Sequence, residues 1–310
     1  MPSYQKKTWL SLLLQIVKTV LFLKNSKPSV LVTGANGQLG NELRVVAADY
    51  PTHHFIFTSR KELAVDDADA VKRFFAEQQI DYCINCAAYT AVDKAESDPE
   101  AAYRINETAA ACLATLCNEH HTRLIHISTD YVFNGQATEP YKEDDPTNPL
   151  GVYGVSKRKG EEAVLKNDPS AVIIRTSWLY SSFGHNFVKT MLRLMKERES
   201  INVVNDQYGC PTYAADLAAA IMQIITSGIN KPGIYHYSNA GASTWYELAA
   251  AIKELTRSKC IINPVTTAEY PTPAKRPAYS VFDTAKIRSV FGLVIPQWKD
   301  SLAACLNRLK

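Results

Sequence analysis

The 310-residue sequence has no strong excess of charge, no internal repeat and no low-complexity tract. Its formal net charge is +3, but residues 1–26 contribute four lysines and no acidic residue. The remaining chain has 34 − 4 = 30 basic and 31 acidic side chains, a balance of −1. This balance gives no indication of a basic nucleic-acid-binding surface, so no nucleic acid is expected among the partners.

The cysteines and histidines form neither a disulfide framework nor a metal pattern. Seven cysteines are an odd number, scattered along a long chain, which favours a reduced, cytoplasmic setting. Cys83 and Cys86 match C-x-x-C, but residues three apart on a strand point to opposite faces, so buried thiols are favoured over a redox or metal pair. The histidine pairs 53–54 and 120–121 are adjacent rather than spaced for one ion. We therefore assign no metal ligand.

The sequence also lacks an apolar run suited to a confident membrane span. Residues 9–23 are apolar over about 15 positions, fewer than the roughly 20 that a spanning helix needs. Gln15 and Lys18 interrupt this run, and no small-x-small cleavage site follows it. We predict that residues 1–27 are an N-terminal extension outside the fold, helical or unrelated to it. No membrane contact is expected unless residues 9–23 act as a surface anchor.

The rest of the sequence alternates between strand-like and helix-like segments. The strand-like segments are residues 29–33, 54–58, 82–86, 123–128 and 171–175. This alternation predicts an α/β protein with a doubly wound parallel sheet of the Rossmann type. The pattern becomes irregular after residue 175. We therefore expect residues 28–175 to be mainly a nucleotide-binding domain, and residues 176–310 to be mainly a smaller substrate-binding lobe interleaved with the last strands.

A glycine-rich turn lies between the first strand-like segment and the first helix-like one. Its spacing is Gly-x-x-Gly-x-x-Gly, and by itself such a turn is often only structural. Between a strand and a helix, however, it lets the backbone approach a pyrophosphate at the helix N-terminus. The residues predicted to bind the cofactor at this turn are Gly34, Asn36, Gly37, Gln38, Leu39 and Gly40.

Two further segments are expected to bind the same cofactor. The second strand is followed by Arg60 where an NAD-binding protein would have an acid, which suits the 2′-phosphate of NADP, although Arg60 could equally be a solvated loop residue. Of Asp66 and Asp67, we assign Asp66 to the adenine. The third strand is followed by small and polar residues, which typically wall the ligand crevice of such a sheet. These are Ala87, Ala88, Tyr89 and Thr90.

Tyr153 and Lys157 are the candidate catalytic pair. They are four residues apart, so on a helix both project from one face. An ammonium beside the phenol is expected to lower the pKa of Tyr153 from about 10 and to make it an acid or base near neutral pH. The pair alone is a weak signal, since exposed pairs at this spacing are common. Its place after the glycine turn and after a strand that ends in Ser128 and Thr129 strengthens it.

Taken together, these motifs resemble the extended short-chain dehydrogenase/reductases of the nucleotide-sugar branch. Residues 33–40, 128–133, 175–178 and 206–212 resemble more closely the dTDP-4-dehydrorhamnose reductase family. The likeness runs from about residue 28 to the C-terminus, with the motifs in the order of the family.

The resemblance implies reduction of the C4 ketone of dTDP-4-dehydro-L-rhamnose to dTDP-L-rhamnose, with NADPH or alternatively NADH. It implies that Tyr153 protonates the developing alkoxide and that Lys157 holds the ribose and poises Tyr153. It also implies that Thr129, or alternatively Ser128, bonds the carbonyl oxygen. Trp178 is expected to form a surface for the sugar, against an even alternative as a core residue. The residues expected to bind the substrate are Ser128, Thr129, Asp130, Tyr131 and Trp178.

Some functional alternatives stay open at this point. Some members of the family are magnesium-dependent dimers, so Mg²⁺ and a homodimer remain open, with no magnesium ligands assigned. A relative of the same fold binds NADP as a regulatory subunit, and other members are epimerases, dehydratases or reductases of other nucleotide 4-keto sugars. A dehydratase commonly has two acids after the central threonine, and this sequence has only Asp130 there.

Overall fold

The structure is a computed structural model that describes residues 27–309. The predicted N-terminal extension, with its candidate anchor at residues 9–23, therefore lies almost entirely outside the described residues. Within residues 27–309, no helix has the length and apolar character needed to cross a membrane.

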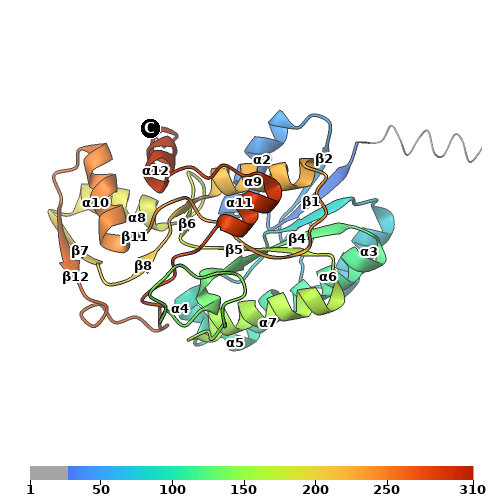
Figure 1. The fold of residues 1–310 in the computed structure, drawn as a ribbon, viewed down its shortest axis with the longest axis horizontal. Helices are drawn as coiled ribbons and strands as arrows, with labels where there is room; N and C mark the ends of the chain where they lie inside the picture. Colours follow the sequence, from blue (N-terminus) through green and yellow to red (C-terminus); the bar gives the residue numbers. More distant parts are fainter. Residues whose placement is uncertain (1–26, 310) are drawn as a thin grey trace, which may run out of the picture.

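A six-stranded parallel sheet forms the centre of the molecule (Figure 1), and its strand order is β10-β5-β4-β3-β1-β2. The strands are β1 (Ser29–Thr33), β2 (His54–Thr58), β3 (Tyr82–Asn85), β4 (Arg123–Thr129), β5 (Val172–Thr176) and β10 (Gly233–His236). Every neighbouring pair is parallel. The chain passes from β1 to β2 and then returns to the other side of β1 to form β3. The topological switch point therefore lies between β1 and β3, and the predicted doubly wound parallel sheet is confirmed.

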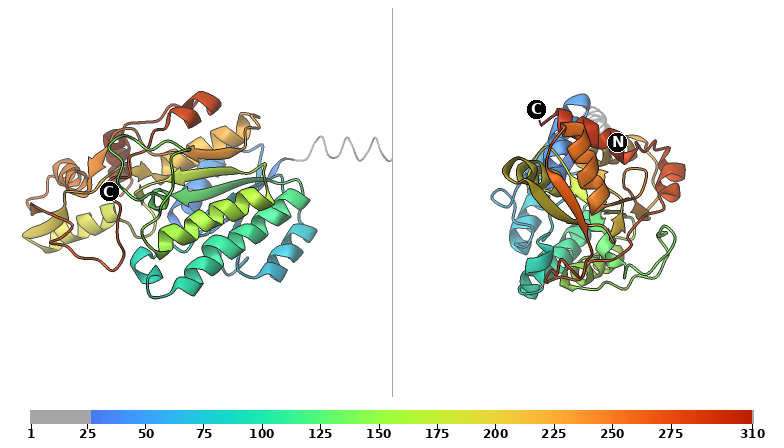
Figure 2. Two further views of the ribbon diagram at one scale, coloured as in Figure 1. Left: turned by 60° about the horizontal axis from the view of Figure 1, so that its bottom comes forward. Right: turned by 90° about the vertical axis from the view of Figure 1, so that its left-hand side faces the viewer.

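Helices cover both faces of the sheet. One layer contains α2 (Gln38–Val46), α9 (Ala214–Thr226) and α11 (Ala285–Phe291), and the other contains α3 (Ala68–Glu77), α6 (Ala109–Glu119) and α7 (Val152–Asn167). The layers lie on opposite sides of the sheet in the turned views (Figure 2). Side chains of β1 alternate between them, since Val30 and Val32 pack in one apolar cluster and Leu31 in the other.

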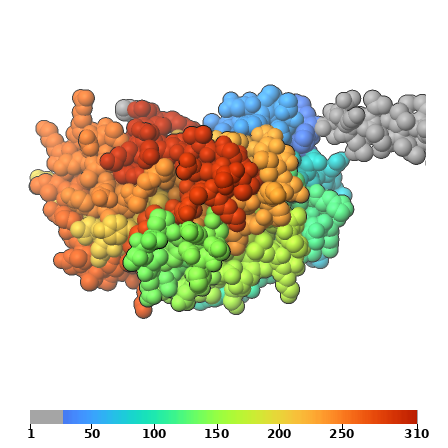
Figure 3. Space-filling view, viewed as in Figure 1, coloured from blue at the N-terminus to red at the C-terminus, as the bar shows by residue number. Residues whose placement is uncertain are grey.

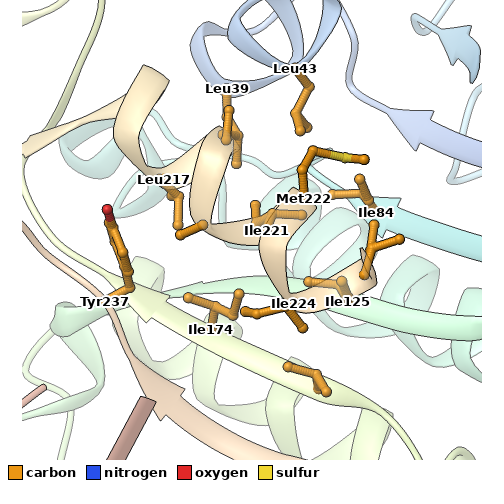
Figure 4. Close-up of a cluster of buried hydrophobic side chains, with 14 of the residues drawn as sticks. Leu39, Leu43, Ile84, Ile125, Ile174, Leu217, Ile221, Met222, Ile224 and Tyr237 are labelled. Carbon is orange, nitrogen blue, oxygen red and sulfur yellow. The ribbon is translucent and has the colours of Figure 1, made fainter. Parts of the chain in front are cut away.

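The first of these clusters joins the α2–α9 layer to the sheet. Figure 4 shows Leu39 and Leu43 of α2 and Leu217 and Ile221 of α9 directed toward Ile84, Ile125 and Ile174 of the strands. Most of these side chains are fully buried. Burial of a leucine or isoleucine side chain contributes about 1.5–3 kcal/mol, so this cluster is a main source of the stability of the sheet.

A close approach of α7 to a neighbouring turn positions the catalytic helix. A Cβ at Gly160 would lie 2.0 Å from the carbonyl oxygen of Asn106, so only glycine permits this contact. Asn106 belongs to the π-helical turn η2 (Arg104–Thr108), which separates α5 (Pro99–Tyr103) from α6. The resulting contact packs the middle of α7, the helix that carries Tyr153 and Lys157, directly against η2.

Segments of the chain after β5 form a smaller lobe with an apolar core of its own, which includes Val188, Met191, Leu248, Ile252 and Leu302. Its helices are α8 (Phe187–Glu197), α10 (Trp245–Thr256) and α12 (Trp298–Asn307), and β7 (Ser200–Val204) pairs with β12 (Ile261–Val265). Short strand pairs complete it: β6 (Leu179–Tyr180) with β9 (Thr212–Tyr213), and β8 (Tyr208–Gly209) with β11 (Ser243–Thr244).

The lobe and the nucleotide-binding half are interleaved along the chain. Strand β10 and helices α9 and α11 come from the C-terminal third but belong to the central sheet and its covering layer. In the space-filling view (Figure 3), orange and red C-terminal segments adjoin a green segment from the middle of the chain. A β-bridge between Tyr141 and Phe282 joins these segments.

Candidate active site

A cavity of about 700 Å³ lies at the carboxyl ends of the parallel strands and includes the switch point. Every residue that the sequence predicted for the site lines this cavity, with the exception of Asn36 and Tyr89. Arg60 and Asp66 lie among the lining residues, as do Thr129, Tyr153 and Trp178. The residues predicted from the sequence therefore gather around one cavity.

The glycine turn forms a cradle with no room for side chains. Gly34 has a φ of +63°, and a Cβ there would lie 2.7 Å from the backbone nitrogen of Ala87. A Cβ at Gly40 would lie 2.5 Å from the Cα of Ala35. Gly37 is the N-cap of α2 and provides no side-chain cap for the amides of the first turn. These amides and the positive end of the helix dipole therefore suit the pyrophosphate of a dinucleotide cofactor.

Asn36 and Tyr89 lie outside the cavity. Asn36 is exposed at the tip of the turn. Tyr89 packs in a separate apolar cluster with Ala95, Ala102 and Tyr153. The amide of Asn106 accepts a hydrogen bond from the backbone nitrogen of Tyr89 at 2.9 Å and donates one to its carbonyl at 3.1 Å. These two hydrogen bonds fix the backbone at Tyr89, and the expected contact of Tyr89 with the cofactor stays a prediction.

Two guanidinium groups meet one carboxylate near the outer end of the cavity. Arg60 Nη2 and Arg104 Nε each lie 3.2 Å from Asp66 Oδ2. The Arg60 side chain is 70% exposed, whereas that of Asp66 is 12% exposed. Asp66 therefore anchors both arginines at the cavity mouth. Arg104 was missed from the sequence because it lies 38 residues after Asp66, on a different element, and no local pattern marks it.

The candidate catalytic groups converge at the end of β4. The phenol of Tyr153 is hydrogen-bonded to the side chain of Thr129. Thr129 Oγ1 donates to Asp130 Oδ1 at 3.0 Å and accepts from the backbone nitrogen of Tyr131 at 3.2 Å. Lys157 Nζ donates to the carbonyl of Ile127 at 2.6 Å. The residues that carry the hydroxyl, the phenol and the ammonium all line the same cavity.

Burial determines the protonation states of the pair. It raises the pKa of Tyr153 to about 12, and the hydrogen bond with Thr129 opposes this shift. It lowers the pKa of Lys157 to about 8, and the charge of Glu161 opposes that shift. The prediction that the pKa of Tyr153 lies below its usual value of about 10 is therefore wrong, because desolvation of the phenol dominates. Tyr153 is protonated at neutral pH, which is the form that donates a proton.

Asp130 is a buried acid beside this pair. Burial raises its pKa to about 6, although hydrogen bonds from Ser280 and Thr129 oppose the shift. Its Oδ2 atom is buried without a hydrogen-bond partner within the described chain. One oxygen of the Asp130 carboxyl therefore accepts a hydrogen bond from Thr129. The other oxygen is desolvated, which favours the neutral acid at mildly acidic pH.

Ser128 lines the cavity, and its hydroxyl forms a hydrogen bond within the protein. Its hydroxyl donates to Glu161 Oε1 at 2.6 Å, and Arg175 donates to both oxygens of Glu161 at 2.8 Å. Successive side chains of a strand point to opposite faces, so the hydroxyls of Ser128 and Thr129 cannot both face the same ketone. The structure commits the hydroxyl of Ser128 to Glu161 and leaves Thr129 as the candidate carbonyl donor.

Two tryptophans line the other end of the cavity. The ring of Trp178 stacks on that of Trp245 with a centroid distance of 3.6 Å and an interplanar angle of 8°. Leu179 and His185 also line this end. Trp245 was not predicted, since it lies 67 residues after Trp178 in the sequence, on the first turn of α10. No sequence signal connects the two rings.

Residues 27–309 contain no group of three or more His, Cys, Asp or Glu side chains placed to hold a metal ion. No chemical step is therefore assigned to a bound metal.

A glycine cradle at the switch point of a doubly wound sheet, together with a Thr, Tyr and Lys constellation at the end of its fourth strand, is typical of a short-chain dehydrogenase/reductase. The comparisons with known proteins agree. A family model described as the RmlD substrate binding domain matches residues 28–310. The chain belongs to this family, in which relatives about 40% identical over most of their length are named dTDP-4-dehydrorhamnose reductase.

The similar proteins include both curated sequences and solved structures. The dTDP-4-dehydrorhamnose reductase of Aggregatibacter actinomycetemcomitans is 40% identical, over 88% of this chain and 96% of its own. The spore coat polysaccharide biosynthesis protein SpsK of Bacillus subtilis is 43% identical, over 90% and 96%. The crystal structure of dTDP-4-dehydrorhamnose reductase from Bacillus anthracis in complex with NADP is 39% identical, with a TM-score of 0.88 over 91% of this chain and 99% of that one. The Thermus thermophilus UDP-glucose 4-epimerase in complex with NAD is 19% identical with a TM-score of 0.76, which shows the shared fold alone.

Proposed function

We propose that this protein reduces the C4 ketone of dTDP-4-dehydro-L-rhamnose to dTDP-L-rhamnose with NADPH, the last step of dTDP-rhamnose biosynthesis. The observation that carries the proposal is the hydrogen-bonded pair of Thr129 and Tyr153, with Lys157 one helical turn further on, in the cavity that also contains the glycine cradle. The names of the relatives support the substrate, and the NADP complex of the Bacillus anthracis protein supports the cofactor. NADH is the alternative cofactor.

Bound NADPH would supply the hydride, and the residues of this chain would handle the oxygen of the ketone. Tyr153, protonated at neutral pH, donates its proton to the developing alkoxide. Thr129 lies within hydrogen-bond reach of the same phenol and stabilises negative charge, first on the substrate oxygen and then on the phenolate. Lys157 provides a positive charge that favours the phenolate after proton transfer.

The other residues of the cavity would bind and orient the two ligands. The amides around Gly37 and Gln38 hold the pyrophosphate, and Ala87, Ala88 and Thr90 form the wall of the cofactor crevice. Arg60 binds the 2′-phosphate and Asp66 lies by the adenine. Asp130, Tyr131 and Trp178 contact the sugar side. Their place along one cavity, between the glycine cradle and the tryptophan pair, supports this assignment.

Three wider expectations are also kept as proposals. The division into a nucleotide-binding part at residues 28–175 and a substrate lobe at residues 176–310 is supported by the separate apolar core of the lobe. A cytoplasmic location is supported by the free thiols of all seven cysteines. A homodimer rests on the family resemblance alone, and sedimentation of the purified protein tests it.

Replacement of Tyr153 by Phe tests the proposed function. The variant loses the proton donor but keeps the ring, so we expect kcat to fall by about 10² or more while the Kd for NADPH changes less than about twofold. The readout is NADPH oxidation with dTDP-4-dehydro-L-rhamnose. Tyr89→Phe is the matched control, since it removes a nearby hydroxyl that lies outside the cavity and should leave kcat unchanged. Full turnover by Tyr153→Phe would contradict the proposal.

A further inference from the structure

The indole of Trp178 is enclosed on both of its faces. Trp245 covers one face, with the rings nearly parallel at 3.6 Å. On the other side, a Cβ at Gly209 would lie 2.4 Å from Cε2 of Trp178 and 2.7 Å from Cζ2 and Nε1. Since Cε2 is nearer than the two ring atoms bonded to it, Gly209 lies over the ring and not beside its edge. Only an edge of Trp178 is therefore left to line the cavity.

No side chain other than hydrogen fits at position 209 while Trp178 keeps its place. A carbon 2.4 Å from a ring carbon is far inside van der Waals contact, and the neighbouring atoms belong to a rigid ring held by Trp245. Gly209 lies in β8, which pairs with β11 just before Trp245. One short antiparallel ribbon thus positions both sides of the enclosed ring.

Trp245 is itself fixed by several contacts. It is the first residue of α10, whose N-terminus has a capping box formed by Thr244 and Glu247. Its Nε1 donates to Gln207 Oε1 at 3.2 Å, and the ring of Phe187 packs against it at 4.7 Å. Gln207 is buried and also donates to Thr267 Oγ1 at 3.0 Å. Because Gln207 and Gly209 belong to the same segment, this segment fixes Trp245 and leaves space for Trp178.

The backbone of Trp178 requires such support. Its φ of +47° lies in the left-handed region, which bulky side chains rarely adopt and which persists only where the surroundings over-determine it. Trp178 also lies two residues after Thr176, which is paired in register with Thr129 of β4. A change in the direction of the indole would therefore alter the cavity beside the candidate catalytic hydroxyl.

We propose that Trp245 and Gly209 are positioning residues that clamp Trp178 edge-on, so that the clamped indole is the wall that sets the width of the sugar subsite. The ligand class is the hexose of a nucleotide 4-keto sugar, and this inference rests on the proposed function. The clamp determines substrate affinity and selection, whereas Thr129, Tyr153 and Lys157 perform the chemistry. Loss of the clamp therefore acts on KM rather than on kcat.

The experiment combines kinetics with circular dichroism of the full-length protein. Two parallel indoles at 3.6 Å are expected to give an exciton couplet in the far ultraviolet, which reports the stack without any ligand. The variants are Trp245→Ala, Trp245→Phe and Gly209→Ala. Trp298→Phe is the control, because Trp298 is buried in the core of the lobe and does not itself line the cavity.

We expect Trp245→Ala to lose the couplet and to raise KM for dTDP-4-dehydro-L-rhamnose about tenfold, with kcat changed less than about threefold and the Kd for NADPH unchanged. Trp245→Phe should lose the couplet but recover most of KM, since a ring still covers Trp178. Gly209→Ala should weaken the couplet and raise KM. Trp298→Phe should keep both the couplet and KM.

Two results overturn the inference. The first is that the wild-type spectrum shows no couplet, or shows one that remains in Trp245→Ala. The second is an unchanged KM in a folded Trp245→Ala variant. Thermal melts show whether each variant is folded, and the KM of Gly209→Ala decides the matter if Trp245→Ala is not folded. If wild-type protein does not reduce the sugar, the proposed function fails separately. The clamp is then decided by calorimetric Kd values for dTDP-L-rhamnose, and equal affinity of wild type, Trp245→Ala and Gly209→Ala, or no binding, overturns it.

Discussion

Lys157 donates a hydrogen bond from Nζ to the backbone carbonyl of Ile127 at 2.6 Å. The ammonium is therefore fixed beneath the end of β4 by the strand itself, one residue before Ser128 and two before Thr129. Its pKa is lowered to about 8 by burial, with Glu161 opposing the shift. The charge that favours the phenolate of Tyr153 is thus present below about pH 8 and absent above it.

The first prediction concerns the pH dependence of catalysis. We expect kcat/KM for ketone reduction to fall as the pH rises through about 8, where Lys157 loses its proton. Tyr153 does not cause this fall, since its pKa is raised to about 12. The measurement is NADPH oxidation from pH 6 to pH 10 at saturating cofactor. A constant kcat/KM up to pH 10 would contradict the role assigned to Lys157.

The second prediction concerns Asp130 and stability. The pKa of its carboxyl is raised from 3.8 to about 6 in the native state, so the native protein binds a proton that the unfolded chain has released between these values. The contribution of Asp130 to stability is therefore lost as the pH rises from about 4 to about 6. Asp130→Asn does not titrate, and its free energy of unfolding relative to wild type should rise over this range by on the order of 2–3 kcal/mol.

Urea unfolding at pH 4.5, 5.5 and 7 measures this difference for Asp130→Asn. Glu139→Gln is the control, because Glu139 is an exposed acid and its substitution should give no pH-dependent difference. A difference between Asp130→Asn and wild type that stays constant across the three pH values would argue against a buried, pKa-raised carboxyl.

The third prediction concerns the buried pair of Glu161 and Arg175. Both side chains are almost fully buried, and Glu161→Gln leaves the guanidinium of Arg175 without its counter-charge. We expect this substitution to lower the free energy of unfolding by about 3–5 kcal/mol. Ser128→Ala removes one hydrogen bond to Glu161 and should cost about 1–2 kcal/mol. Chemical denaturation gives both values.

Glu162→Gln is the matched control for this third prediction. Glu162 is the next residue on α7, but its side chain is 58% exposed and it pairs only with a partly exposed arginine. Its substitution should change the free energy of unfolding by less than about 0.5 kcal/mol. Equal losses for Glu161→Gln and Glu162→Gln would show that the buried pair does not stabilise the fold.

The fourth prediction concerns cofactor selection by Arg60. If its guanidinium binds the 2′-phosphate, Arg60→Ala should raise the Kd for NADPH about tenfold and leave the Kd for NADH unchanged. Fluorescence titration with both cofactors measures this ratio. Lys61→Ala removes an adjacent exposed cation and is expected to leave the ratio unchanged. An equal loss of affinity for NADPH and NADH in Arg60→Ala would show that Arg60 shapes the mouth of the cavity and does not recognise the 2′-phosphate.

The sequence predicted the elements that depend on local patterns. The strands around Val30, Ile84 and Ile125 were recognisable because short apolar segments alternate along the sequence with segments of helical periodicity. The glycine turn was recognisable because the backbone geometry at position 34 requires glycine. The resemblance to a family then placed Tyr153, Lys157 and Thr129 in order along one site. These predictions needed only neighbouring residues or known motif order.

The parts that the sequence did not predict depend on contacts between distant residues. Trp245 and Arg104 reach the cavity region from separate helices, and no spacing rule connects them with Trp178 or Asp66. The pKa of Tyr153 depends on how deeply the ring is buried, so its direction was predicted wrongly. The choice between Ser128 and Thr129 required the position of Glu161, which lies on another element.

Because β10 and α9 come from the C-terminal part of the sequence, they are synthesised late, and this affects how the chain can fold during synthesis. When the ribosome has released residue 210, five of the six strands exist, but α9, which covers one face of the sheet, and β10, which completes its edge, have not emerged. The nascent nucleotide-binding half therefore exposes an apolar face and an open strand edge until roughly the last quarter of translation. The nucleotide-binding half therefore cannot complete its core as an independent N-terminal domain before the C-terminal segments have been synthesised.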